Sequence, residues 1–148
     1  MRQTQTLSER RFALDTNAII YYLDHKEPYR TWLEPHFDSM AAGDSRFVLS
    51  VIVDAELHVK PLRDGDTEAL LRIEALISSK SVEILPVTLA IARQAARIRA
   101  KLDLELPDAI VVASAVIGRC DALVGNDRRC AQRVTEIPYI YLDEAVKA

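Results

Sequence analysis

Four acidic residues of this sequence have a type and placement that could do chemistry: Asp15, Glu56, Asp108 and Asp127. Ionised carboxylates that share a partly buried cleft repel one another, so either their pKa values rise or a cation neutralises them. Ligation by carboxylate and water oxygens suits Mg²⁺ or Mn²⁺, whereas zinc and copper sites usually recruit His or Cys. If the four side chains converge, the sequence predicts a site for a hard divalent cation.

The predicted strands place two of these acids at one edge of a sheet. Asp15 directly follows the apolar run FAL, and Asp127 comes just after the apolar run ALV. Strands that alternate with helices form a parallel sheet with right-handed crossovers, so their carboxyl ends share one edge. Ligands of open α/β sheets bind outside that edge, at the point where the strand order reverses.

The other two acids belong to predicted helices. Ser50 is a helix N-cap after an apolar strand that runs through Leu49, which places Glu56 in the first two turns of the following helix. Asp108 lies in the first turn of a helix that begins near Pro107 and ends at Gly118. This helix is apolar nearly all round, so we expect it to be buried.

The chain as a whole alternates between strand and helix patterns. The strand segments are RFAL, RFVL, SVEILPV, DALV and IPYIYLD, and the helical ones include AIIYYLD, EALLRIEALISS, TLAIARQAARIRAKL and residues 128–134. We predict a three-layer α/β/α sandwich with a central parallel sheet. It forms a single domain over residues 11–148, preceded by a flexible N-terminal leader at residues 1–10.

Each acid also has a purely structural interpretation. Asp15 could cap its helix, Asp108 could stabilise the positive end of its helix, Asp127 could belong to a turn, and Glu56 could be solvated. Because functional sites cluster charge, four acids at matching element ends favour a shared site over four separate structural roles.

Composition excludes several other classes of protein. Hydrophobic residues make up 49% of the chain and charged residues 28%, which is typical of a globular protein. No apolar run approaches the roughly 18 residues of a membrane span, and the first ten residues lack a signal-peptide pattern, so we expect a cytoplasmic protein. Cys120 and Cys130 lack CxxC spacing and are expected to be reduced thiols. No phosphate-binding loop or nucleophile elbow is present.

The sequence resembles the PIN-domain family, and within it the VapC-like toxin ribonucleases. The motifs LDTNAII, LSVIVDAELHV, LPDAIVVASA and LVGND carry the resemblance, which extends from Phe12 to about Tyr141. It implies a PIN-like fold and Mg²⁺- or Mn²⁺-dependent endoribonuclease activity on RNA phosphodiester bonds. It also implies the toxin role of a toxin-antitoxin pair, with a cognate antitoxin protein as partner and a homodimeric state. By motif position, the catalytic and metal-binding acids are Asp15, Glu56, Asp108 and Asp127, with Asn17 and Ser50 as polar support.

One position departs from the family pattern. The family usually carries Thr or Ser two residues before the final acid, where this chain has Gly125. Asn126 could supply a substitute contact. The departure motivates an alternative function, a catalytically weakened PIN-like module that binds RNA or a protein. A phosphoacceptor receiver domain would share the α/β layout, but the last strand offers no Lys for a phosphoryl group.

Basic residues follow the last acid, although the net charge of the chain is −3. Arg128, Arg129 and Arg133 could contact RNA, or they could form a solvated helix face.

Aromatic residues gather in the segment YYLDHKEPYRTWLEPHF. Tyr21, Tyr22, Trp32 and Phe37 could belong to an interface, but their spacing favours a place in the core.

Overall fold

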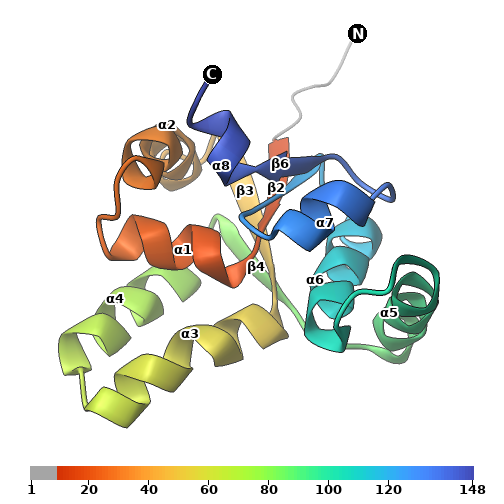
Figure 1. Cartoon of the computed structure of the whole chain (residues 1–148). Coiled ribbons are helices and arrows are strands. Elements are labelled where there is room, and N and C mark those ends of the chain that lie inside the picture. Colours follow the sequence, from red (N-terminus) through yellow and green to blue (C-terminus); the bar gives the residue numbers. More distant parts are fainter. Residues whose placement is uncertain (1–9) are drawn as a thin grey trace, which may run out of the picture.

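A parallel sheet of five strands, in the order β4-β3-β2-β5-β6, forms the centre of residues 10–148, which are the residues that the computed structural model describes (Figure 1). The strands are β2 (Arg10–Leu14), β3 (Ser45–Ser50), β4 (Val82–Leu85), β5 (Ala122–Gly125) and β6 (Tyr139–Tyr141). The expected leader at residues 1–10 lies outside the described residues except for Arg10, which is the first residue of β2. The five strands coincide with the five segments that the sequence predicts.

Helices cover both faces of the sheet. They are α1 (Thr16–Leu23), α2 (Tyr29–Ala41), α3 (Val51–Asp64), α4 (Thr67–Ile77), α5 (Leu89–Leu102), α6 (Leu106–Ile117), α7 (Arg128–Arg133) and α8 (Leu142–Ala145). Figure 1 shows α1 to α4 on one side of the sheet and α5, α6 and α7 on the other. The predicted three-layer α/β/α sandwich is therefore confirmed. The sequence pattern predicts no bounds for α2 and does not predict α8.

The strand order reverses between β2 and β5. The chain moves outward from β2 through β3 to β4, then crosses to β5 on the opposite side of β2. Residues Leu14 and Val124 are paired in register, and the Asp15 N–H donates to the Val124 carbonyl at 2.9 Å. Asp15 therefore begins the segment that leaves the sheet at its switch point.

Apolar side chains from both helical layers bury the sheet. Phe47, Leu49 and Leu123 on the strands are at most 1% exposed, and α6 buries six of its residues. The burial of these six residues agrees with the prediction that α6 is buried. This helix packs against the sheet and carries Asp108. The packing of these buried residues thus fixes the position of α6.

The aromatic residues of α1 and α2 belong mainly to the core. Phe37 is 3% exposed, stacks on Tyr22 and meets Phe47 edge to face. Tyr21 and Trp32 are partly buried and pack against the same cluster. The core interpretation of these residues is therefore confirmed.

Cys120 and Cys130 are free cysteines. In the part of the chain that the structure describes, no helix combines the length and the apolar character needed to cross a membrane.

Candidate active site

Asp15 and Asp127 cap the helices that follow their strands. Asp15 Oδ1 accepts the Thr16 N–H at 2.8 Å at the start of α1, and Asp127 Oδ1 accepts the Cys130 N–H at 2.8 Å at the start of α7. A carboxylate has two oxygens, so each cap leaves a second oxygen for another ligand. The capping role and a role in a shared site are therefore compatible.

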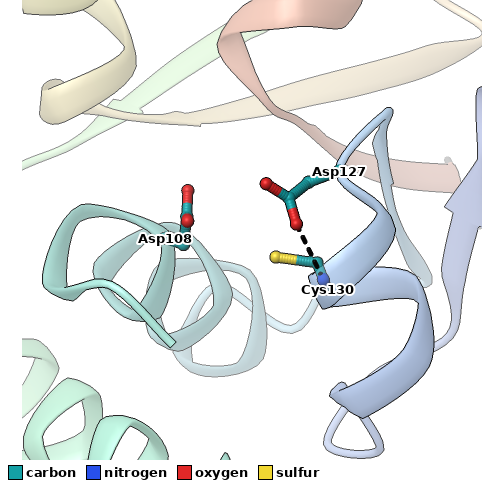
Figure 2. Close-up of side chains that lie close together, drawn as sticks. All are labelled: Asp108, Asp127 and Cys130. Atoms are coloured by element: carbon teal, nitrogen blue, oxygen red, sulfur yellow. Dashed lines mark hydrogen bonds between the residues drawn. The ribbon is translucent and has the colours of Figure 1, made fainter. Parts of the chain in front are cut away.

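Asp108 reaches this edge of the sheet from the first turn of α6. Figure 2 shows its carboxylate facing the side chains of Asp127 and Cys130. Ligand atoms of these three residues all lie within 4.8 Å of one another. The buried helix α6 and the short helix α7 thus bring two carboxylates, from positions far apart in the sequence, to one place.

A hydrogen bond from Thr16 connects Glu56 to this edge of the sheet. The Thr16 hydroxyl donates to Glu56 Oε1 at 2.5 Å, which joins the start of α1 to the second turn of α3. From the sequence, Thr16 is expected to begin its helix and to belong to the polar network of the site. Its contact to Glu56 spans 40 positions of the sequence, so no local pattern could have revealed it.

The electrostatics of Asp15 and Asp108 reflect a crowded acidic cluster. Burial, followed by repulsion from Asp108, Glu56 and Asp127, raises the pKa of Asp15 to about 6, against the opposing hydrogen bond from the Thr16 N–H. Burial, followed by repulsion from Asp127, Glu56 and Glu105, raises the pKa of Asp108 to about 6 as well. The charges of Glu56 and Asp127 therefore act on both Asp15 and Asp108, which four separate structural roles would not require.

These residues fit a hard divalent cation. Their donors are carboxylate oxygens, and a bound cation would offset both the burial and the mutual repulsion that raise the two pKa values. Cys130 lies next to them, but burial and the charges of Asp127, Asp108 and Asp15 raise the pKa of its thiol. Because a thiol ligates a metal as the thiolate, the oxygen donors are the ones suited to bind here.

Gly125 lies under the hydroxyl of Tyr139. A Cβ atom built at residue 125 would be 2.5 Å from Tyr139 Oη and 3.2 Å from the Asp15 Cβ. The Asp127 N–H donates to the same Oη at 3.0 Å. A side chain at residue 125 would displace the Tyr139 hydroxyl, so this position of the tyrosine needs a glycine at residue 125. No motif of the sequence indicates this contact of Tyr139.

The Asn126 side chain makes its hydrogen bonds to residues other than the four candidate acids. Its Oδ1 accepts the Asp143 N–H at 2.9 Å, and its Nδ2 donates to Tyr21 Oη and Asp143 Oδ1, both at 3.2 Å. The amide thus links the end of β5 to α1 and α8. It does not supply the substitute contact that we expected of it, because its hydrogen bonds are made to these partners.

The two polar residues expected to support the site have different surroundings. Ser50 is 3% exposed, and its Oγ accepts the Ile52 N–H at 3.2 Å as the N-cap of α3, the helix that carries Glu56. Asn17 is exposed on the first turn of α1. Among residues 10–148 its side chain makes no hydrogen bond.

The three arginines after Asp127 do not form one surface. Arg133 donates to the carbonyl oxygens of Leu102 and Asp103, at 3.2 and 2.8 Å, and so closes the end of α5. Arg128 and Arg129 are exposed at the start of α7, and the charge of Arg129 opposes the rise in the pKa of Asp108. Arg128 and Arg129 remain the candidates for the expected RNA contact. Arg133 instead stabilises the end of α5.

Comparisons with known proteins point to one family. A family model described as PIN domain matches residues 12–136. No curated protein sequence matches the chain. VapBC2 from Rickettsia felis, bound to a DNA fragment from their promoter, has a similar structure with a TM-score of 0.69 and 19% identity, covering 88% of this chain and 98% of that one.

Two further solved structures share the fold. A toxin-antitoxin complex from Klebsiella pneumoniae has a TM-score of 0.64 and 23% identity, covering 85% of this chain and 98% of that one. VapBC-5 from Mycobacterium tuberculosis has a TM-score of 0.60 and 23% identity, covering 88% of this chain and 98% of that one.

Proposed function

Because this chain belongs to the PIN domain family, we propose that it is a Mg²⁺- or Mn²⁺-dependent endoribonuclease that hydrolyses RNA phosphodiester bonds. The observation that carries the proposal is the convergence of acids at the switch point of the sheet. Asp108 and Asp127 place ligand atoms within 4.8 Å of each other, and burial together with repulsion from Asp127 and Glu56 raises the pKa of both Asp15 and Asp108.

The proposed reaction adds a water oxygen to phosphorus and breaks the bond from phosphorus to the leaving oxygen, and a proton from the water is transferred to that leaving oxygen. Asp15, Glu56, Asp108 and Asp127 would hold the cation, which supplies charge neutralisation at the phosphate and a more acidic water. The protein's own contribution is to hold these oxygens in place. The caps of α1 and α7 orient Asp15 and Asp127, and the Thr16 hydroxyl orients Glu56.

RNA is an anion and the site is acidic, so the approach of a substrate needs local positive charge. Arg128 and Arg129 are exposed and directly follow Asp127 in the chain. We assign them to the phosphate groups that flank the cleaved bond, because guanidinium groups bind phosphate through paired hydrogen bonds. Their placement on α7 would guide the RNA backbone past the acids.

We further propose that the chain is the toxin of a VapC-like toxin-antitoxin pair, acts in the cytoplasm, binds a cognate antitoxin and forms a homodimer. The support is the motif resemblance together with the shared fold of the Rickettsia felis and Mycobacterium tuberculosis VapBC proteins. Co-purification with the product of an adjacent gene, followed by light scattering of the complex and of the free chain, tests the partner and the dimer.

The alternative function is a PIN-like module that binds RNA or protein and has weakened catalysis. The reason to consider it is Gly125, which stands where the family usually carries Thr or Ser. Tyr139 places a hydroxyl oxygen in the space above Gly125, next to the main chain of Asp127. Position 125 therefore gives less reason to expect lost catalysis than the sequence alone suggested. The same cleavage assay decides between the two functions.

The decisive experiment is cleavage of a mixed-sequence fluorogenic RNA by the purified chain with Mn²⁺, with Mg²⁺ and with a chelator. We expect metal-dependent turnover that is lost in Asp108→Asn. Asp38→Asn is the matched control, because Asp38 is exposed on α2. A chain that binds Mn²⁺ but cleaves no RNA in this assay would favour the non-catalytic module, and equal turnover by Asp108→Asn would refute the site.

A further inference from the structure

Tyr139 reaches the acidic site from a strand that carries none of the acids. It is the first residue of β6 and pairs in register with Leu123 of β5. From there its side chain extends to the loop after β5, where its Oη accepts the Asp127 N–H at 3.0 Å. The ring is partly buried, so its position is set by packing as well as by this hydrogen bond.

The hydroxyl of Tyr139 fills the space between the segments that carry Asp15 and Asp127. A Cβ built at Gly125 lies 2.5 Å from Tyr139 Oη and 3.2 Å from the Asp15 Cβ, so this space is bounded by the hydroxyl on one side and by Asp15 on the other. Because the Oη accepts the hydrogen bond from Asp127, its own hydrogen stays available for a second acceptor. Burial, followed by the charges of Cys130, Asp15 and Asp127, raises the pKa of this hydroxyl, against the opposing hydrogen bond from the Asp127 N–H.

We propose that Tyr139 is a positioning residue of the acidic site, whose hydroxyl fixes the main chain of Asp127 and sets its spacing from Asp15. This inference rests on the proposed function, because it assigns Tyr139 to the support of the same cation-binding acids. Outer groups that orient metal ligands typically change metal affinity or activity by 10- to 100-fold when they are removed. Tyr139 itself acts through Asp127 and touches no reacting atom.

A packing role alone would have different consequences. If Tyr139 merely fills space beside β5, the loss of its hydroxyl would lower the stability of the fold and leave the affinity for the cation unchanged. If it positions Asp127, the affinity for the cation would fall as well. Binding of Mn²⁺ therefore separates the two roles without reference to RNA cleavage.

The first variant is Tyr139→Phe, which keeps the ring and removes only the hydroxyl. We expect its Mn²⁺ dissociation constant, measured by titration calorimetry on the full chain, to be about tenfold higher than that of the unmodified chain. Tyr22→Phe is the matched control, because the Tyr22 ring stacks on Phe37 in the core. It removes the same hydroxyl elsewhere, and its Mn²⁺ affinity should equal that of the unmodified chain.

The second variant, Gly125→Ala, places a methyl group against the Tyr139 hydroxyl. We expect it to weaken Mn²⁺ binding strongly in the unmodified chain and less in the Tyr139→Phe background, where the nearest ring atom is Cζ at 3.2 Å. Equal losses in both backgrounds, or an unchanged Mn²⁺ affinity in Tyr139→Phe, would overturn the inference.

The outcomes also separate this inference from the proposed function. Weaker Mn²⁺ binding by Tyr139→Phe supports the inference even if the unmodified chain cleaves no RNA. RNA cleavage by a Tyr139→Phe chain with unchanged Mn²⁺ affinity keeps the function and rejects the inference. An unmodified chain that binds no Mn²⁺ would overturn both.

Discussion

The Thr16 hydroxyl donates a hydrogen bond to Glu56 Oε1 at 2.5 Å and so joins α1 to α3 at the acidic edge of the sheet. Asp15, directly before Thr16, accepts the Thr16 N–H at 2.8 Å. One residue therefore touches two of the four acids, one through its main chain and the other through its side chain. The orientation of Glu56, which is otherwise exposed on α3, depends on this contact.

Removing the Thr16 hydroxyl should weaken the site. In Thr16→Val the shape of the side chain is kept, and Glu56 loses the donor that orients it. We expect metal-dependent RNA cleavage to fall roughly tenfold, as for other groups that orient metal ligands. Thr16→Ser keeps the hydroxyl and should retain most of the activity. Equal cleavage by the Val variant and the unmodified chain would show that Glu56 does not need this contact.

Neutralising Asp15 should stabilise the metal-free protein. Asn is as good an N-cap as Asp, so Asp15→Asn keeps the start of α1 while it removes a charge that is costly to bury. We expect the free energy of unfolding in urea, at pH 7 with chelator, to rise by roughly 1 to 3 kcal/mol. Saturating Mg²⁺ should stabilise the unmodified chain and leave the variant unchanged.

Asp66→Asn is the control for this substitution. Asp66 caps α4 through a hydrogen bond from the Ala69 N–H at 3.0 Å, and it is exposed. The same change at this second N-cap should alter the free energy of unfolding little. If Asp66→Asn raised the free energy of unfolding as much as Asp15→Asn does, burial among acids would not be the cause of the stabilisation.

The metal-free protein should lose stability as the pH rises. Folding raises the pKa of Asp15 and Asp108 from 3.8 to about 6, so the folded chain holds protons that the unfolded chain has released. Their contribution to stability is thus fully present below pH 3.8 and is lost as the pH rises through about 6.

Urea denaturation in the presence of a chelator measures this contribution to stability. A range from about pH 4.5 to about 7.5 spans the pH at which the contribution is lost. The difference in unfolding free energy between the unmodified chain and the Asp15→Asn, Asp108→Asn double variant isolates it from other titrating groups. As the pH rises, the unfolding free energy of the double variant should increase relative to that of the unmodified chain. A difference that stays constant over this range would contradict the acidic cluster.

Reversing the charge of Arg128 and Arg129 should weaken RNA binding. In a chelated buffer, which prevents cleavage, we expect the double Glu variant to bind a single-stranded RNA less tightly and with a shallower dependence on salt. Arg63 and Arg72 are exposed on α3 and α4, so the same double reversal there matches the change in net charge. Equal losses in the two double variants would assign the effect to total charge rather than to α7.

The sequence by itself predicted the strands, most of the helices and the four candidate acids. Strand segments alternate with amphipathic or apolar helices, and local signals mark where each begins and ends. Ser50 caps α3, Pro107 lies in the first turn of α6, and Asp15 directly follows β2. These signals act between neighbours in the chain, which is why they could be interpreted without a structure, and a parallel sheet then implied a common edge for the strand ends.

The tertiary structure alone decided which side chains meet at that edge. Thr16 holds Glu56 across 40 positions, the Tyr139 hydroxyl fills the space above Gly125, and Cys130 lies beside Asp108. Asn126 could have faced the acids, but it bonds to α8 and α1 instead. Such contacts depend on strand register, on how each helix packs against the sheet and on the rotamer each side chain adopts there. No spacing rule along the chain encodes these, because they arise from the packing of segments that are distant in sequence.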